Sequence, residues 1–376
     1  MANLFDYISW RGDLYFTQSP LNPVDYVVLS QLSYFPFDGI VPGPEETGGV
    51  QFKAAGSILL ERIKNDASVQ KTLFMFKEDP DFLKALVSSN RFGNCCLMGY
   101  VNQIDTEKEI QFSAICIHTG DGSCSVIFRG TDTSFVGWKE DLNMTFKETI
   151  PAQQEAVKYL EKMASLTSGP LRVSGHSKGG NLAVYAASFC DRKTQMRITD
   201  IFNFDAPGFH EKTISSEGYC AIKDKIRSYI PQSSVIGLFL EQGSNYSVVK
   251  STQLGIFQHS LFSWEVTHND MVYLDDVTLS SRFVDKTLSE WIGSIDNDHR
   301  EKFIEAMYAI INASEAKTLQ ELESTWFMSM GKIIRSLTSI DEPTKKIFMK
   351  AFIQLIRSAR RNIETFLINK NDEQET

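Results

Sequence analysis

The 376-residue sequence lacks a long apolar stretch and lacks an excess of basic charge. A membrane-spanning helix needs about 18 or more largely apolar residues in a row, so we expect no transmembrane segment. The opening residues MANLFDYISWRGDLYF have no basic region followed by an apolar run, which argues against a secretory signal. The net charge of −9 leaves no basic field to attract nucleic acid phosphates, and we expect no nucleic-acid partner.

Cysteine is also scarce, and the six cysteines include no C-x-x-C pair. That spacing is typical of zinc and dithiol sites, so the cysteine pattern predicts neither zinc binding nor redox chemistry. Cys116 and Cys124 lie in apolar, strand-like runs, where buried free thiols are the ordinary outcome. This pattern favours a reducing cytoplasm as the compartment.

Periodicity divides the chain into three parts. Residues 1–109 have mostly helical and irregular patterns, and we expect a helical N-terminal region packed on the core. In residues 110–275 strand patterns alternate with helical ones, which predicts a mostly parallel sheet covered by helices on both faces, the α/β class. Residues 276–376 have helical patterns alone, so we expect a helical C-terminal cap or appendage.

Two hairpins are expected within the middle part. The β-branched and aromatic runs at 110–118 and 123–129 flank the turn residues TGDG, a strong hairpin signal. A weaker pattern predicts a second hairpin from 244–251 and 253–259.

The stretch VSGHSKGGNLA, residues 173–183, contains G-x-S-x-G centred on Ser177. An apolar strand pattern precedes it and a small-residue helix pattern follows, the context of a nucleophile elbow. Such a turn forces the serine into strained backbone angles, so Gly175 and Gly179 must lack bulk. A tight strand–helix connection with a solvated serine is the alternative interpretation.

A second segment, VIFRGTDTSFVGWKEDL at 126–142, precedes this turn. Together the two segments resemble the class 3 (fungal-type) lipases of the α/β-hydrolase superfamily. The resemblance implies that Thr131 and the backbone of Lys178 form the oxyanion hole, and that residues 132–140 match a lid by position. The Lys178 side chain would attract an anionic substrate group or project into solvent, and solvent is the more frequent outcome for lysine.

Most of the chain also resembles a narrower bacterial group, the Mbeg1-like branch of that superfamily. The residues that carry this resemblance are the opening LFDYISWRGDLYF, the turn GHSKGGNLA, the strand NFDAPGF and the segment YIPQSSVIGLFLE. It supports an α/β-hydrolase fold and implies no particular substrate.

The general base must follow the nucleophile in this fold, where chain order is serine, acid, histidine. His259 and His268 satisfy that order, and His210 lies too close after the turn. The lipase resemblance places the base at His259, which we choose. A structural histidine with its hydrogen bonds satisfied is the alternative.

The acid departs from the lipase pattern. Where class 3 lipases have an aspartate, this chain has Ser233, in PQSSV at 231–235. A serine cannot stabilise an imidazolium by charge. Asp205, at the end of the preceding strand pattern, is the substitute we favour, although it also suits a cap or turn before PG at 207–208. Glu241, Glu265 and Asp270 are further candidates.

We therefore predict a serine hydrolase with Ser177 as nucleophile, His259 as base and Asp205 as acid, acting on a small-molecule or lipid-like ester. The alternative is a catalytically weak or inactive hydrolase fold that binds a lipid or a protein partner. The missing aspartate at Ser233 motivates that alternative, and the helical C-terminus would be its interaction surface.

Overall fold

The structure is a computed structural model that describes residues 1–65, 74–132, 135–144, 146–243, 245–296 and 298–302, and a few positions between 346 and 362. By its internal contacts the chain forms two compact units. The first contains Met1–Gln103, Phe112–Gly130 and Pro151–Val277, and the second contains Ile104–Gln111, Thr131–Ile150 and Thr278–Thr376. The predicted boundaries at 109/110 and 275/276 stay predictions.

Among the described residues of the first unit, five helices precede the sheet's long strands: α1 (Leu4–Arg11), α2 (Pro23–Leu32), α3 (Phe52–Asn65), α5 (Asp79–Ser88) and α6 (Asn90–Gly93). α1 and α2 each begin with a capping box. The side chains of Asn3 and Asn22 accept from backbone N–H groups of the first turn, and the side chains of Asp6 and Asp25 accept from the backbone N–H groups of those asparagines. A buried ion pair joins α2 to α6, because Arg91 donates to both carboxylate oxygens of Asp25 at 2.6 and 2.7 Å.

The described strands form one nine-stranded sheet in which sequence order is also spatial order. They are β1 (Val50–Gln51), β2 (Cys96–Asp105), β3 (Ile110–His118), β4 (Cys124–Phe128), β5 (Leu171–His176), β6 (Ile198–Phe204), β7 (Ile226–Pro231), β8 (Tyr246–Val249) and β9 (Tyr273–Leu274). The run from β4 to β8 is parallel throughout. The carboxyl ends of these strands therefore meet along one edge of the sheet.

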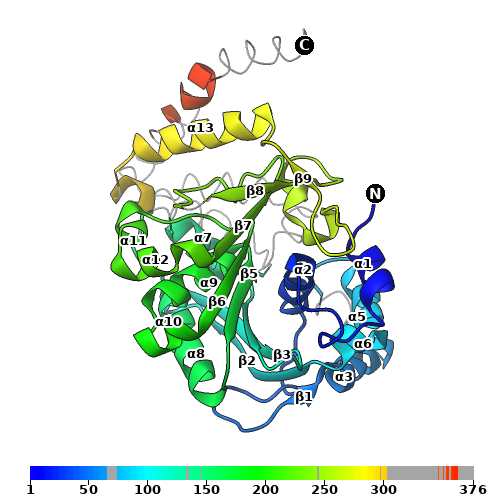
Figure 1. Cartoon of the computed structure of the whole chain (residues 1–376). Helices are drawn as coiled ribbons and strands as arrows, with labels where there is room; N and C mark the ends of the chain where they lie inside the picture. Colours follow the sequence, from blue (N-terminus) through cyan, green and yellow to red (C-terminus); the bar gives the residue numbers. More distant parts are fainter. Residues whose placement is uncertain are drawn as a thin grey trace. The chain divides into compact units, whose positions relative to one another are not determined.

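Helices cover both faces of this parallel run, as the sequence predicted (Figure 1). α8 (Pro151–Leu166), α9 (Lys178–Phe189) and α10 (Arg192–Arg197) lie on one face, followed by the short α11 (Glu211–Ile214) and α12 (Glu217–Ile222). α2 packs against the opposite face of β4, β5 and β6. There Ser30 and Ser174 share a hydrogen bond of 2.8 Å between buried hydroxyls, and Tyr26 stacks on Phe202 with ring centroids 4.0 Å apart.

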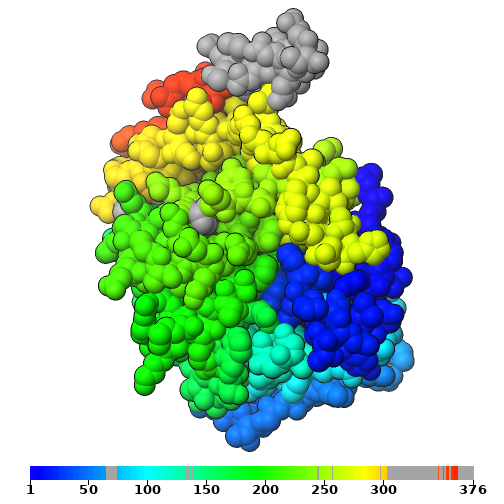
Figure 2. Space-filling view, in the orientation of Figure 1, coloured from blue at the N-terminus to red at the C-terminus, as the bar shows by residue number. Residues whose placement is uncertain are grey.

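The segment after β8 returns to the N-terminus. Figure 2 shows it in yellow beside the blue opening residues. The Val266 N–H donates to the Ala2 carbonyl at 3.0 Å, and Phe5 stacks on Phe262 with centroids 6.0 Å apart. The helical N-terminal region is thereby fixed to the segment that carries His259.

The first predicted hairpin is confirmed, because β3 and β4 pair antiparallel. The second is wrong: residues 255–259 form a 3₁₀ helix, η2 (Gly255–His259), and β8 pairs instead with β7 and with β9. Gly255 has a positive φ of 54°, which interrupts the extended pattern seen in the sequence.

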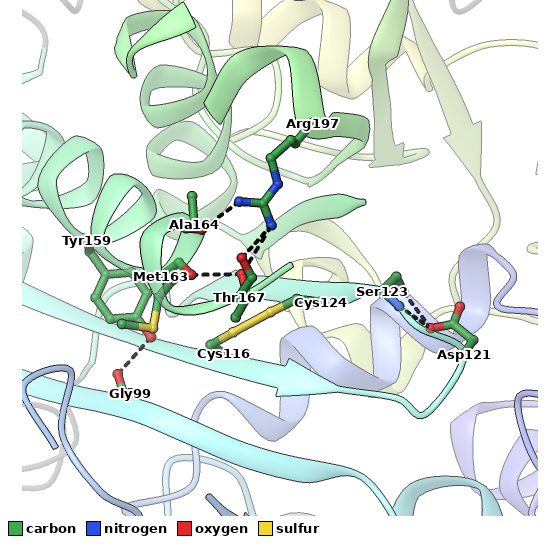
Figure 3. Close-up of a disulfide and its surroundings, with 10 residues drawn as sticks. All are labelled: Gly99, Cys116, Asp121, Ser123, Cys124, Tyr159, Met163, Ala164, Thr167 and Arg197. Carbon is green, nitrogen blue, oxygen red and sulfur yellow. Dashed lines mark hydrogen bonds between the residues drawn. A yellow bond between two sulfur atoms is a disulfide. The ribbon is translucent and has the colours of Figure 1, made fainter. Parts of the chain in front are cut away.

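The expectation of free thiols at Cys116 and Cys124 is also wrong, since a disulfide joins them across β3 and β4 (Figure 3). His118 pairs directly with Cys124, and Cys116 lies two residues before His118, so both sulfurs are on one face of the sheet. Near this disulfide, Arg197 donates to the carbonyl oxygens of Ala164 and Thr167 around the end of α8 (Figure 3).

The described residues of the second unit include the helices α7 (Phe135–Asn143) and α13 (Leu279–Gly293), and the short stretches 298–302 and 357–362 are also helical. Glu109 accepts from Lys139 at 2.6 Å and from Asn143 at 3.0 Å, which fixes α7 to the β2–β3 turn. The predicted C-terminal helical patterns between 303 and 345 lie outside the described residues. None of the helices in the described ranges is both long enough and apolar enough to cross a membrane.

Candidate active site

Ser177 lies between the end of β5 and the start of α9 in a conformation rare for a residue with a side chain. Its φ is 57° and its ψ is −135°. Steric strain of this kind persists only where surrounding structure enforces it, and it is characteristic of a nucleophile elbow.

Two glycines make this turn possible. A Cβ on Gly175 would overlap the Gly179 carbonyl group, and a Cβ on Gly179 would overlap the Phe128 carbonyl oxygen at the end of β4. The G-x-S-x-G spacing therefore follows from close backbone packing of β4, β5 and α9, as the sequence argument required.

Asp205 lies beside this turn, one strand along the sheet. β5 and β6 are in register with His176 opposite Phe204, so Ser177 and Asp205 each follow the last residue of adjacent parallel strands. The Ser177 N–H donates to the Phe204 carbonyl at 2.9 Å. Asp205 is 1% exposed and also has a positive φ, 47°, which turns its side chain out of the strand direction.

His259 ends η2 and contacts this carboxylate. Its Nδ1 lies 2.6 Å from Oδ2 of Asp205. A carboxylate only accepts, so Nδ1 carries the hydrogen, and in the neutral form of the ring Nε2 is then the nitrogen without a hydrogen. The His259 side chain is about one-quarter exposed, at 25%. The tautomer with hydrogen on Nδ1 is the one that a general base requires.

The segment that lacks the lipase aspartate supports the carboxylate of Asp205. Ser234 donates to Oδ1 of Asp205 at 2.5 Å, and the Gly237 N–H donates to the same oxygen at 3.1 Å. The Ser233 N–H donates to the side chain of Gln258 at 2.8 Å, next to the base. Ser234 was not among the predicted site residues, because nothing in the sequence distinguishes it from the neighbouring Ser233 in PQSSV.

The other acid candidates have other partners. Glu265 lies 3.3 Å from Lys250, Asp270 accepts from the Met271 N–H at 2.9 Å, and Glu241 forms a backbone bridge to Phe209. His268, the other histidine in the correct order, stacks on Trp10 with centroids 4.4 Å apart. Asp205 and His259 are the predicted site residues that the structure brings into hydrogen-bond contact.

The two predicted oxyanion residues fall in different units. Lys178 is the first residue of α9, and its side chain is buried at 1% exposure, so the expectation that it projects into solvent is wrong. Thr131 belongs to the second unit, where its hydroxyl donates to Asp141 at 2.6 Å. The predicted lid at 132–140 overlaps α7, and residues 133–134 lie outside the described ranges. The oxyanion and lid roles stay predictions.

Comparison with known proteins gives a family and a set of distant structures. The Mbeg1-like family model matches residues 86–309, more than half of the chain. No curated protein matches the sequence. The native Rhizomucor miehei lipase–propeptide complex is similar with a TM-score of 0.36 and 12% identity, over 61% of this chain and 68% of that chain.

Two further structures are similar at the same level. A fungal lipase–inhibitor complex has a TM-score of 0.38 and 11% identity, over 61% of this chain and 79% of its own. M37 lipase has a TM-score of 0.35 and 14% identity, over 57% of this chain and 69% of its own. The chain's own architecture identifies the fold: the parallel strands β4 to β8, helices on both faces and the strained turn between β5 and α9 constitute an α/β-hydrolase fold, and the predicted fold class is confirmed.

Proposed function

The chain belongs to the Mbeg1-like family, and from this premise we propose that it is a serine hydrolase that cleaves an acyl ester through an acyl-enzyme on Ser177. The observation that carries the proposal is the 2.6 Å contact between His259 Nδ1 and Asp205 Oδ2, beside the strained turn at Ser177. A lipase-like fold alone would not distinguish an enzyme from an inactive relative.

The proposed reaction uses the unprotonated Nε2 of His259. This nitrogen takes the proton of the Ser177 hydroxyl as its Oγ forms a bond to the ester carbonyl carbon. The Asp205 carboxylate stabilises the resulting imidazolium, which then protonates the leaving alcohol as the ester bond breaks. In the second half, the oxygen of a water molecule bonds to the acyl carbon as His259 takes its proton. The imidazolium then returns a proton to Ser177 Oγ as the acyl–serine bond breaks, which releases the carboxylic acid and restores Ser177.

The tetrahedral intermediates need hydrogen-bond donors for their oxyanion. We assign this role to the backbone N–H of Lys178, which begins α9 and lies at the positive end of the helix dipole. Thr131 is the second donor by resemblance to the class 3 lipases. The mechanism needs no metal and no organic cofactor.

The experiment is hydrolysis of a series of p-nitrophenyl esters from acetate to palmitate by the full chain. We expect turnover that Ser177→Ala abolishes, and the preferred chain length then defines the acyl group. Ser165→Ala is the matched control, because Ser165 is exposed and donates only to its own helix. Absence of turnover across the series, in folded protein with and without detergent, would favour the binding alternative.

A further inference from the structure

His176, the residue before the candidate nucleophile, connects two segments that are distant in sequence. Its Nε2 lies 2.8 Å from the backbone carbonyl oxygen of His259. Its Nδ1 lies 2.9 Å from the hydroxyl of Tyr34, which follows α2 in the N-terminal region. His176 is 2% exposed and ends β5; its contact with Tyr34 is buried, and its contact with the His259 carbonyl is partly buried.

The direction of both hydrogen bonds follows from their chemistry. A carbonyl oxygen only accepts, so Nε2 of His176 carries a hydrogen and donates to His259. Burial, together with the neighbouring His259, holds the pKa of His176 well below its ordinary value, and the ring is neutral. Nδ1 therefore has no hydrogen and accepts from the Tyr34 hydroxyl.

These contacts hold the base at a second point. The ring of His259 is bound to Asp205 through Nδ1, and its backbone carbonyl is bound to the residue adjacent to Ser177. The rings of His176 and His259 are 4.5 Å apart between centroids and tilted by 36°, so they also pack on each other. Because η2 is a 3₁₀ helix of only five residues, its own backbone hydrogen bonds do little to fix its position.

The chain after β4 packs closely around this arrangement. A Cβ on Gly130 would overlap the Tyr34 hydroxyl oxygen and would lie 2.6 Å from the His176 carbonyl oxygen. Tyr34 also contacts Phe76 edge-on at 5.9 Å between centroids. The hydroxyl of Tyr34 is thus held where His176 needs a donor.

We propose that His176 and Tyr34 are positioning residues that fix the backbone of His259 against the nucleophile turn. This inference rests on the proposed hydrolase function and extends it, because it gives the N-terminal helical region a part in the active site. Neither residue touches the reacting atoms in this account. They act by limiting the positions that the base can take, and a misplacement of about 1 Å can cost about a hundredfold in rate.

The first test reads the hydrogen bonds directly. We expect the nitrogen NMR spectrum of histidine-labelled protein to show His176 as the neutral tautomer with hydrogen on Nε2 at neutral pH. Tyr34→Phe should shift the His176 Nδ1 signal, whereas Tyr15→Phe, at an exposed tyrosine, should not. An imidazolium, or the tautomer with hydrogen on Nδ1, would overturn the proposal.

The second test separates positioning from folding. His176→Gln keeps an amide donor near the place of Nε2, and we expect its kcat to stay within about threefold of the parent. His176→Leu keeps the bulk but removes the donor, and its kcat should fall about tenfold to a hundredfold with KM nearly unchanged. Equal activity of both variants and the parent would overturn the inference and leave the hydrolase intact.

The two proposals fail in different ways. A parent chain that hydrolyses no ester and whose Ser177 accepts no acylating or phosphonylating reagent would overturn the hydrolase and this inference together. An active parent whose rate is insensitive to His176→Leu overturns the inference alone. Thermal unfolding of each variant shows whether a lost rate reflects loss of the folded state. A folded His176→Gln variant that keeps its rate would separate loss of the donor from loss of folding.

Discussion

The Nδ1 atom of His259 lies 2.6 Å from Oδ2 of Asp205, at the end of β6, although the class 3 lipase resemblance pointed to a position after β7. The segment after β7 reaches back toward this carboxylate, and Ser234 donates to its other oxygen at 2.5 Å. The candidate acid thus follows β6 and not β7, and Ser234, next to the expected acid position at Ser233, donates a hydrogen bond to it.

Asp205→Asn tests the role of this carboxylate. The amide cannot carry a negative charge and would bind the wrong tautomer of His259, so we expect kcat to fall by about four orders of magnitude. KM should change little, because the carboxylate does not contact substrate in the proposed mechanism. Steady-state kinetics with circular dichroism to verify folding is the measurement, and a loss below about tenfold would exclude Asp205 as the acid.

Ser234→Ala tests the support of the carboxylate. Losing a hydrogen bond to a charged group costs about 1.5–3 kcal/mol, part of it in stability, so we expect kcat to fall about threefold to thirtyfold. Ser165→Ala is the control, since Ser165 is exposed and its hydroxyl donates within its own helix. Equal rates for the two variants would contradict the assigned role of Ser234.

The nucleophile turn could be predicted from sequence because its constraint is local. Gly175 packs on Gly179 within one five-residue turn, and the spacing of the two glycines is visible as a motif even though Gly179 also packs on Phe128 of β4. The hairpin of β3 and β4 was likewise marked by its turn residues. Short-range geometry of this kind leaves a signature in the order of residues.

The remaining features depend on distant contacts. Asp205 and His259 are separated by 54 residues, and only the register of β5 and β6 with the fold of η2 brings them together. The second hairpin was predicted wrongly because 253–259 contains Leu254, Ile256 and Phe257 in a strand-like run, but the backbone turns at Gly255. The burial of Lys178 was not predicted because a lysine side chain is ordinarily exposed, and the residues next to it in sequence do not indicate that the start of α9 is buried.

Arg91→Met tests the buried ion pair of the N-terminal region. The variant leaves the Asp25 carboxylate buried without its main partner, so we expect a loss of about 3–5 kcal/mol in the free energy of unfolding. Lys84→Met is the control, because the pair of Lys84 with Asp81 is exposed and worth less than about 1 kcal/mol. Urea unfolding of both variants is the measurement, and equal losses would contradict the account.

The buried carboxyl group of Asp79 should make the free energy of unfolding depend on pH. Burial raises the pKa of Asp79 to about 7, well above the 3.8 that is ordinary for an aspartate. The folded state therefore binds the proton more tightly, and this contribution is complete below about pH 4 and is lost as pH rises through about 7. The slope is at most about 1.4 kcal/mol per pH unit.

Asp79→Asn removes this titration. We expect the free energy of unfolding of the parent to fall more steeply than that of the variant between about pH 5 and pH 7. The variant also loses one acceptor, for either Gln31 or Phe76, so the comparison uses the slopes and not the absolute values. Parallel curves would mean that Asp79 titrates normally in the folded protein.

The central claim is that Ser177 is an activated nucleophile, and intact mass after exposure to a fluorophosphonate tests it most directly. We expect one adduct on the parent chain, none on Ser177→Ala and much slower labelling of Asp205→Asn. Detergent in a parallel sample opens any lid that shields the site. A folded parent chain that gains no mass in either sample would contradict the claim, and an adduct that persists in Ser177→Ala would place the reactive group elsewhere.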